Sequence, residues 1–265
     1  MAQSVDRIRI KTKRAKEHII DLESEIKSFF DTKPYVIGTK RNPQTRQLIY
    51  YLVSVLDVPE RIAAITGDIL QNLRSALDHL AYALFMVGPR GASGSPASHI
   101  YFPIYDDAVE YATKSVGKIR GMRQDAIDAI NAVKPYKGGN DTIWLLHRLN
   151  NIDKHRFVIL VGSAFRSMDL GAIAFWDMAE FDPALADMDP IHAFFGPTDR
   201  QFPLKVGDEL FIDAPDAKVK EKLQFCFDIA FGEPGIIEGA PLIETLHGMA
   251  DLVDHLLTDF ALLLA

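Results

Sequence analysis

The sequence predicts an α+β fold in which a helical bundle is flanked by an antiparallel β-sheet. Long segments before residue 155 and after residue 241 repeat apolar side chains three and four positions apart, as one buried helical face requires. Between them, much of residues 156–231 has the period of two and the turn residues that are typical of strands. Because helices precede and follow the strands instead of alternating with them, we expect one α+β domain over residues 1–265.

The first predicted helix covers residues 7–30 and carries a narrow apolar stripe suited to helix packing: Ile8, Thr12, Ala15, Ile19, Leu22, Ile26 and Phe29. Basic residues crowd its first half and acidic residues its second half, the reverse of the order that the helix dipole favours. A solvated face and a basic arm that touches nucleic acid would both explain this charge order. A β-hairpin is expected next, at about residues 35–56.

A second helix is predicted between Pro59, which can start it, and Gly88, which ends it, and its stretch 68–87 is apolar on nearly every face. It contains Arg74, Asp78 and His79, although charged side chains are rarely buried without a partner. Arg74 and Asp78 are four residues apart and can pair on one face, whereas His79 lies about 140° further round the helix than Arg74. One interpretation is an internal ion pair beside a hydrogen-bonded core histidine.

The remaining elements follow from turn residues and periodicity. Residues 88–98 are rich in glycine, serine and proline and are the best candidate for a mobile segment, and residues 99–104 are expected to be extended. Residues 106–134 predict one or two helices, and Asp141 or Thr142 is expected to cap the helix after them. Four strands are predicted in the main β block at about 156–231, at 157–165, 170–176, 207–213 and 223–231. A long loop is predicted at 182–197, and a last helix with an apolar stripe begins at Pro241.

A second polar cluster, NNIDKHR, ends the helix that precedes the β block. Its polar members are Asn150, Asn151, Asp153, Lys154, His155 and Arg156. The last three could simply cap the helix C-terminus, where basic groups are favoured. Alternatively, the cluster could complete a composite site with Arg74, Asp78 and His79, in which case the two helices should pack directly, about 8–10 Å apart.

Composition and missing motifs exclude several classes of protein. A net charge of −7 argues mildly against a protein that coats nucleic acid, without excluding a small basic site. The single cysteine, Cys226, excludes an intramolecular disulfide and a multi-cysteine zinc site. No apolar run reaches the ~20 residues of a membrane span, and a cytoplasmic location without membrane association is expected. Because metal-ligand, phosphate-loop and nucleophile-elbow motifs are missing, we expect no metal and no cofactor.

The stretch RSALDH, from Arg74 to His79, resembles the arginine–polar–x3–histidine motif of the HEPN ribonucleases, helical bundles of bacterial toxin and defence systems. The residues that match are Arg74, Ser75 and His79. The resemblance implies metal-independent RNA cleavage by the arginine and the histidine, at an active site formed across a dimer. The motif lies in an early helix, however, and the β block has no counterpart in that family. LRSALDHL and LNNIDKHR also resemble segments of uncharacterised bacterial proteins.

Three functions are consistent with these residues. In a metal-independent endoribonuclease, His79 would transfer protons, Arg74 would stabilise the charged transition state and Asp78 would orient the imidazole; RNA, an antitoxin-like protein and a second copy of the chain would be its partners. In a non-catalytic ligand- or partner-binding protein, both polar clusters would be structural ion-pair networks. A metal-dependent hydrolase is the third alternative.

Overall fold

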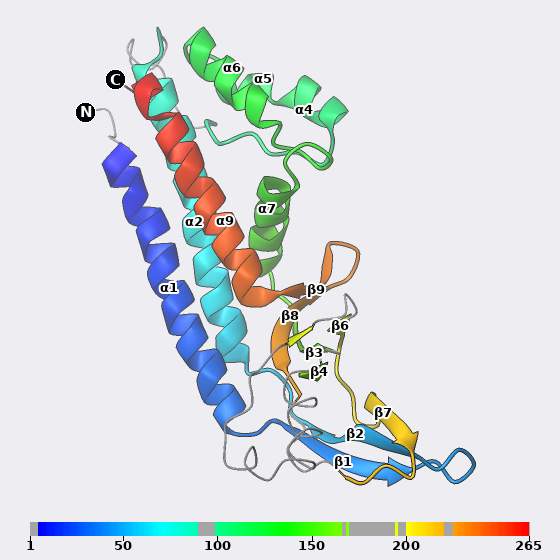
Figure 1. Ribbon diagram of the computed structural model, residues 1–265. Coiled ribbons are helices and arrows are strands. Elements are labelled where there is room, and N and C mark those ends of the chain that lie inside the picture. The colour runs from blue at the N-terminus through cyan, green and yellow to red at the C-terminus, as the bar shows by residue number, and fades with distance from the viewer. Residues whose placement is uncertain are drawn as a thin grey trace.

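The protein has an α+β fold, as the sequence predicts, with the helical bundle at one end and the strands at the other (Figure 1). A computed structural model describes residues 5–89, 99–165, 168–169, 194–195, 200–219 and 225–264. The bundle consists of α1 (Val5–Asp31), α2 (Glu60–Val87), α7 (Asp141–Asp153) and α9 (Leu242–Asp259). These are the four helices that the apolar periodicity selects.

The apolar stripes of α1 and α9 form the centre of the bundle. Every stripe residue of α1 from Ile8 to Phe29 is buried, and so is the corresponding row of α9: Leu242, Leu246, Met249, Val253 and Leu256. Both helices pack against α2, and α1 and α9 also pack against each other. One chain therefore buries both stripes, and neither is left for a second subunit.

Local backbone chemistry determines where α2 begins and ends. Pro59 immediately precedes the first residue of α2. Proline suits a helix start because it fixes φ at a helix-compatible value and has no N–H that would need an acceptor there. At the other end, the backbone N–H of Gly88 donates to the carbonyl of Phe85. Both boundaries are those predicted from the sequence.

The hairpin strands β1 (Tyr35–Arg41) and β2 (Gln47–Val55) pair antiparallel and are extended by β7 (Glu209–Pro215) into a three-stranded sheet, order β1-β2-β7. The sequence places β7 in the main β block instead. Its position beside the hairpin is stabilised by aromatic packing of Phe211 against Tyr50, whose ring centroids are 5.9 Å apart. Such long-range pairing depends on tertiary contacts that periodicity does not contain.

A second antiparallel sheet has the order β6-β3-β8-β9. It contains β3 (Leu160–Phe165), β8 (Phe227–Glu233), β9 (Ile237–Pro241) and the short β6 (Arg200–Gln201). A separate pair joins β4 (Met168–Asp169) to β5 (Phe194–Phe195). The single flanking sheet expected from the sequence is thus divided, and β9 was not predicted. The strand predicted at 170–176 and the segment 90–98 lie outside the described residues, as does the predicted loop at 182–197 except for β5.

Three short helices cover the end of the bundle remote from the sheets: α4 (Ala108–Lys114), α5 (Val116–Ile119) and α6 (Gln124–Val133) (Figure 1). The sequence predicts one or two helices here. A 3₁₀-helix, η2 (Ala261–Leu264), follows α9. The predicted cap of α7 is also wrong by one residue, because the Asn140 side chain accepts from the N–H of Ile143 while Asp141 accepts from Gly138. No helix in the described part of the chain is long and apolar enough to cross a membrane.

Candidate functional site

The helices that carry the two polar clusters, α2 and α7, pack against each other as predicted. The described contacts join the clusters through His147, which lies between Arg74 and Asn151. Contacts at two levels of the interface show the close approach of the two helices. Arg74 of α2 reaches His147 of α7, and nearer the sheets the carboxylate of Asp153 lies against the backbone of α2 at Gly67. A Cβ added at Gly67 would come within 2.3 Å of Asp153 Oδ1, so only glycine allows this approach.

Arg74 forms the centre of a buried network with Asp78, Phe102, His147 and Asn151, referred to below as the Arg74 network. Its Nη1 donates to Asp78 Oδ1 at 2.5 Å, its Nη2 to the carbonyl of Phe102 at 3.1 Å, and its Nε to His147 Nδ1 at 3.3 Å. Asp78 Oδ1 also accepts from the N–H of Phe102 at 3.0 Å. Only 7% of Arg74 is exposed, and burial lowers the pKa of its guanidinium, an effect that the Asp78 carboxylate opposes.

His147 is held in its neutral form. Burial, followed by the charge of Arg74, lowers its pKa to about 4. Because Nδ1 accepts from Arg74, the ring hydrogen belongs on Nε2. Asn151 Nδ2 lies 3.0 Å from that Nε2, so the amide must be turned to present Oδ1 in order to accept the ring hydrogen. The Arg74 network thus runs from α2 to α7 through an imidazole that carries no charge at neutral pH.

His79 is not part of the Arg74 network. It is partly buried and lies beyond Asp78 on the outer side of α2, together with the partly buried Ser75 and the more exposed Tyr82. Ser75 accepts a hydrogen bond from Gln71 at 3.3 Å. The contacts of Asp78 described above go to Arg74 and Phe102, so the carboxylate is held on the side of α2 that faces α7.

The NNIDKHR cluster is divided among five environments, and only its Asn151 belongs to the Arg74 network. Asn150 is 1% exposed, and neither atom of its side-chain amide has a hydrogen-bond partner among the described residues. Asp153 lies at Gly67, where burial and the charge of Asp68 raise its pKa. Lys154 and His155 are exposed.

Arg156 connects the end of α7 to the second sheet. Its two terminal nitrogens donate to the two oxygens of Glu233 in β8 at 2.9 and 2.7 Å, and the N–H of Ile159 donates to the same carboxylate. The Glu233 side chain is only 1% exposed. This contact positions the sheet relative to the bundle and contributes nothing to the Arg74 network.

Sequence reasoning missed two members of the Arg74 network, the backbone of Phe102 and the ring of His147. The spacing of His147 and Asn151, four residues apart on one helical face, was the available signal for the second of them. Among the residues that the structure describes, no group of three or more His, Cys, Asp or Glu side chains is arranged to hold a metal ion.

No protein family, curated protein or solved structure matches this chain. The resemblance carried by Arg74, Ser75 and His79 therefore stays an expectation, and a function has to be argued from the geometry.

Proposed function

We propose that this chain is a non-catalytic binding protein in which the Arg74 network is a structural clamp. The observation that supports this proposal is that the guanidinium is buried and bonded within the chain through all three of its nitrogens. Each of its three nitrogens donates to a group of the same chain, and the side chain is 7% exposed. A guanidinium that stabilises a phosphorane must instead direct N–H groups at the substrate.

The side chains around Arg74 are also poorly suited to act as a general acid or base. A general acid or base works best with a pKa near the operating pH, whereas the pKa of His147 is lowered to about 4. The Asp78 carboxylate accepts from Arg74 and from the backbone of Phe102. The clamp instead connects three segments that are distant in sequence: α2, the extended chain at Phe102, and α7.

A second candidate function, a HEPN-like metal-independent endoribonuclease, is favoured by the position of His79. This histidine lies on the outer side of α2, about 140° from the buried Arg74, where a polynucleotide could reach it. In such an enzyme His79 would act as the general acid or base, and the cation would have to come from a residue other than Arg74.

Purified protein assayed on single-stranded RNA, with and without EDTA, tests the proposal. We expect intact RNA in both conditions, a marked loss of stability in Arg74→Ala because breaking a buried ion pair costs about 3 kcal/mol or more, and a smaller loss in His79→Ala. Cleavage that survives EDTA and disappears in His79→Ala would replace the proposal with the ribonuclease. Cleavage that EDTA stops would indicate a metal-dependent hydrolase. Arg120→Ala, at an exposed arginine, is the matched control for the preparation.

A further inference from the structure

The first half of α1 concentrates positive charge in a protein that is negative overall. From Val5 to Lys16 it has six basic residues and one acid, whereas the whole chain has a net charge of −7. This order opposes the helix dipole, so the charge is not there to stabilise α1 itself. Acidic partners neutralise only some of these cations.

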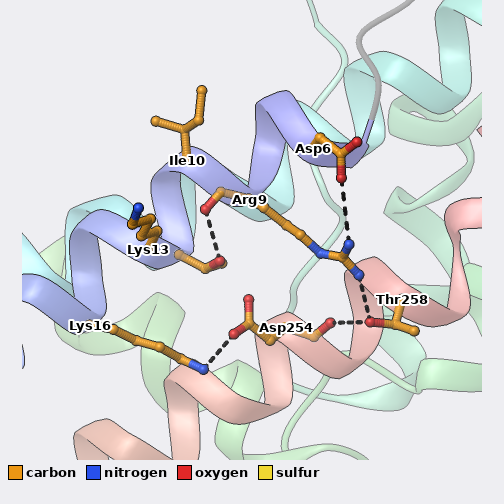
Figure 2. Close-up of a pocket in the computed structure, with 8 residues that line it drawn as sticks. Asp6, Arg9, Ile10, Lys13, Lys16, Asp254 and Thr258 are labelled. Carbon is orange, nitrogen blue, oxygen red and sulfur yellow. Dashed lines mark hydrogen bonds and ion pairs between the residues drawn. The ribbon is translucent and has the colours of Figure 1, made fainter.

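Two of the six cations face α9 and are paired. Arg9 donates to Thr258 at 2.9 Å and lies 3.6 Å from Asp6, and Lys16 contacts Asp254 and Asp251 at 2.5 and 3.1 Å. Of these residues, Asp6, Arg9, Lys16, Asp254 and Thr258 line a depression between α1 and α9, and their side chains point toward one another (Figure 2). Ile10 and Lys13 also line this depression. Because Arg9 and Lys16 are already matched by acids, they leave little unpaired charge for an anion in it.

The outer side of α1 carries unmatched charge. Within the described part of the chain, Arg7, Lys11 and Lys13 have no acidic partner, and Arg14 has only the half-exposed Glu17, at 3.3 Å. Ile10 lies among them and is 65% exposed. Figure 2 shows Ile10 on the side of α1 away from α9, while Ile10 and Lys13 both line the edge of the depression. Arg7, Ile10, Lys11, Lys13 and Arg14 are called the α1 basic face below.

Arg7 of the α1 basic face is on the same side of the molecule as His79. Glu25 of α1 and Arg61 of α2 form an ion pair at 2.9 Å, which fixes how the two antiparallel helices face each other. Arg7 precedes Glu25 by eighteen residues, and His79 follows Arg61 by eighteen residues. Eighteen residues make five complete helical turns, a rise of about 27 Å along the axis. Arg7 and His79 therefore point to the same side of the two-helix layer as the Glu25–Arg61 pair. Tyr82, 37% exposed, is one turn further along α2.

We propose that the α1 basic face binds the phosphate backbone of a single-stranded nucleic acid, whose bases reach His79 and Tyr82 on α2. Such strands are bound by unpaired cations that follow the backbone and by aromatic rings on which bases stack. An acidic protein helix is a poorer fit, because Ile10 is the one apolar residue among the cations of the α1 basic face and a docked helix needs a row of apolar contacts. This inference names the ligand of the binding function proposed above and rests on it.

Fluorescence anisotropy of the full chain with labelled RNA of about 20 nucleotides, and with DNA of the same sequence, tests the proposal. The variant is Arg7→Gln/Lys11→Gln/Lys13→Gln, which leaves no acid unpaired. The matched control is Arg120→Gln/Lys33→Gln/Lys205→Gln, which removes one arginine and two lysines from exposed positions elsewhere. Circular dichroism confirms that both variants are folded.

We expect the α1 variant to bind about tenfold more weakly or worse at low salt, and its slope of log affinity against log salt to fall by about 2, since each phosphate contact on a single strand contributes about 0.7. The control should bind as the unmodified chain does. Equal loss in both variants would show that net charge alone attracts the strand and would overturn the proposal, as would no binding to either strand at about 50 mM salt. Binding of polyglutamate but of neither nucleic acid would assign the face to an acidic protein instead.

The affinities for RNA and for DNA of the same sequence show which of the two kinds of strand the α1 basic face prefers. Gel analysis of the RNA recovered from each titration, with EDTA present, separates this proposal from the proposed function. Bound and intact RNA supports both. Bound RNA that is cleaved supports the α1 basic face while refuting the non-catalytic function, and intact RNA that does not bind refutes the α1 basic face alone.

Discussion

At Gly67 a hydrogen atom in place of a side chain lets the Asp153 carboxylate lie against the backbone of α2. We expect Gly67→Ala to destabilise the protein by about 1–2 kcal/mol, because overpacking at the α7 contact outweighs the better helix propensity of alanine. Gly248→Ala is the control, because Gly248 is an exposed position of α9 where a Cβ meets nothing within 4 Å. The free energy of unfolding of this variant should rise by about 0.5–1 kcal/mol. Urea unfolding of both variants measures the difference. A stabilised Gly67→Ala would mean that α7 can move away at little cost.

His147 should make stability depend on pH. Its pKa is lowered from 6.5 to about 4 in the folded protein, so between these values the unfolded chain binds the proton and the folded chain does not. Stability is therefore complete above pH 6.5 and falls as the pH drops to about 4, by up to about 3 kcal/mol.

Urea unfolding at several pH values, compared with His147→Gln, isolates this contribution from that of the carboxylates. Glutamine can still accept from Arg74 but does not titrate, so the variant should lose less stability than the original chain over this interval. Parallel curves for the two proteins would show that His147 is protonated in the folded state without cost.

The contact between Arg156 and Glu233 connects whole elements, α7 and the second sheet. Arg156→Ala should cost about 2 kcal/mol, because it leaves a nearly fully buried carboxylate without its charged partner. Arg123→Ala removes a similar two-pronged contact, to the exposed Asp125, and should change the free energy of unfolding little. Both variants can be compared in one urea series. Equal effects would mean that burial of Glu233 is unimportant to the contact.

Elements that depend on residues close together in the sequence could be predicted from it, and those that depend on distant residues could not. The stripe of α1 and the ends of α2 at Pro59 and Gly88 depend on residues within a few turns, so the pattern was sufficient. The partner of Arg156 lies 77 residues away, and β7 joins the hairpin across more than 150 residues. Nothing local specifies either contact.

The candidate site shows the same division. The pairing of Arg74 with Asp78 follows from a spacing of four residues, and it is present. The side of the helix on which His79 lies follows from the same geometry. The carbonyl of Phe102 and the ring of His147 could not be assigned to Arg74 beforehand, because their positions depend on how the chain packs between α2 and α7. Burial of the guanidinium, on which the proposed function depends, is a property of that packing.

For the molecule as a whole, the burial of both apolar stripes predicts a monomer. A second subunit would be needed to cover these stripes only if α1 and α9 could not both be buried within one chain, and each is buried. Light scattering at high protein concentration should therefore give the mass of one chain, 29.6 kDa. A stable dimer would require an interface other than these stripes, and would strengthen the ribonuclease candidate, whose family forms its active site between two subunits.

The contact between α1 and α9 also has a consequence for synthesis on the ribosome. Arg9 and Thr258 are hydrogen-bonded across 249 residues, so the side of α1 that faces α9 is translated early and covered last. At about 5–20 residues per second, α1 waits on the order of 10–50 s for α9 to emerge. During that interval α2 can pack on α1, but the bundle stays open along one side. Assembly of the core is thus necessarily late, and agents that recognise exposed apolar surface on nascent chains have that whole interval in which to bind.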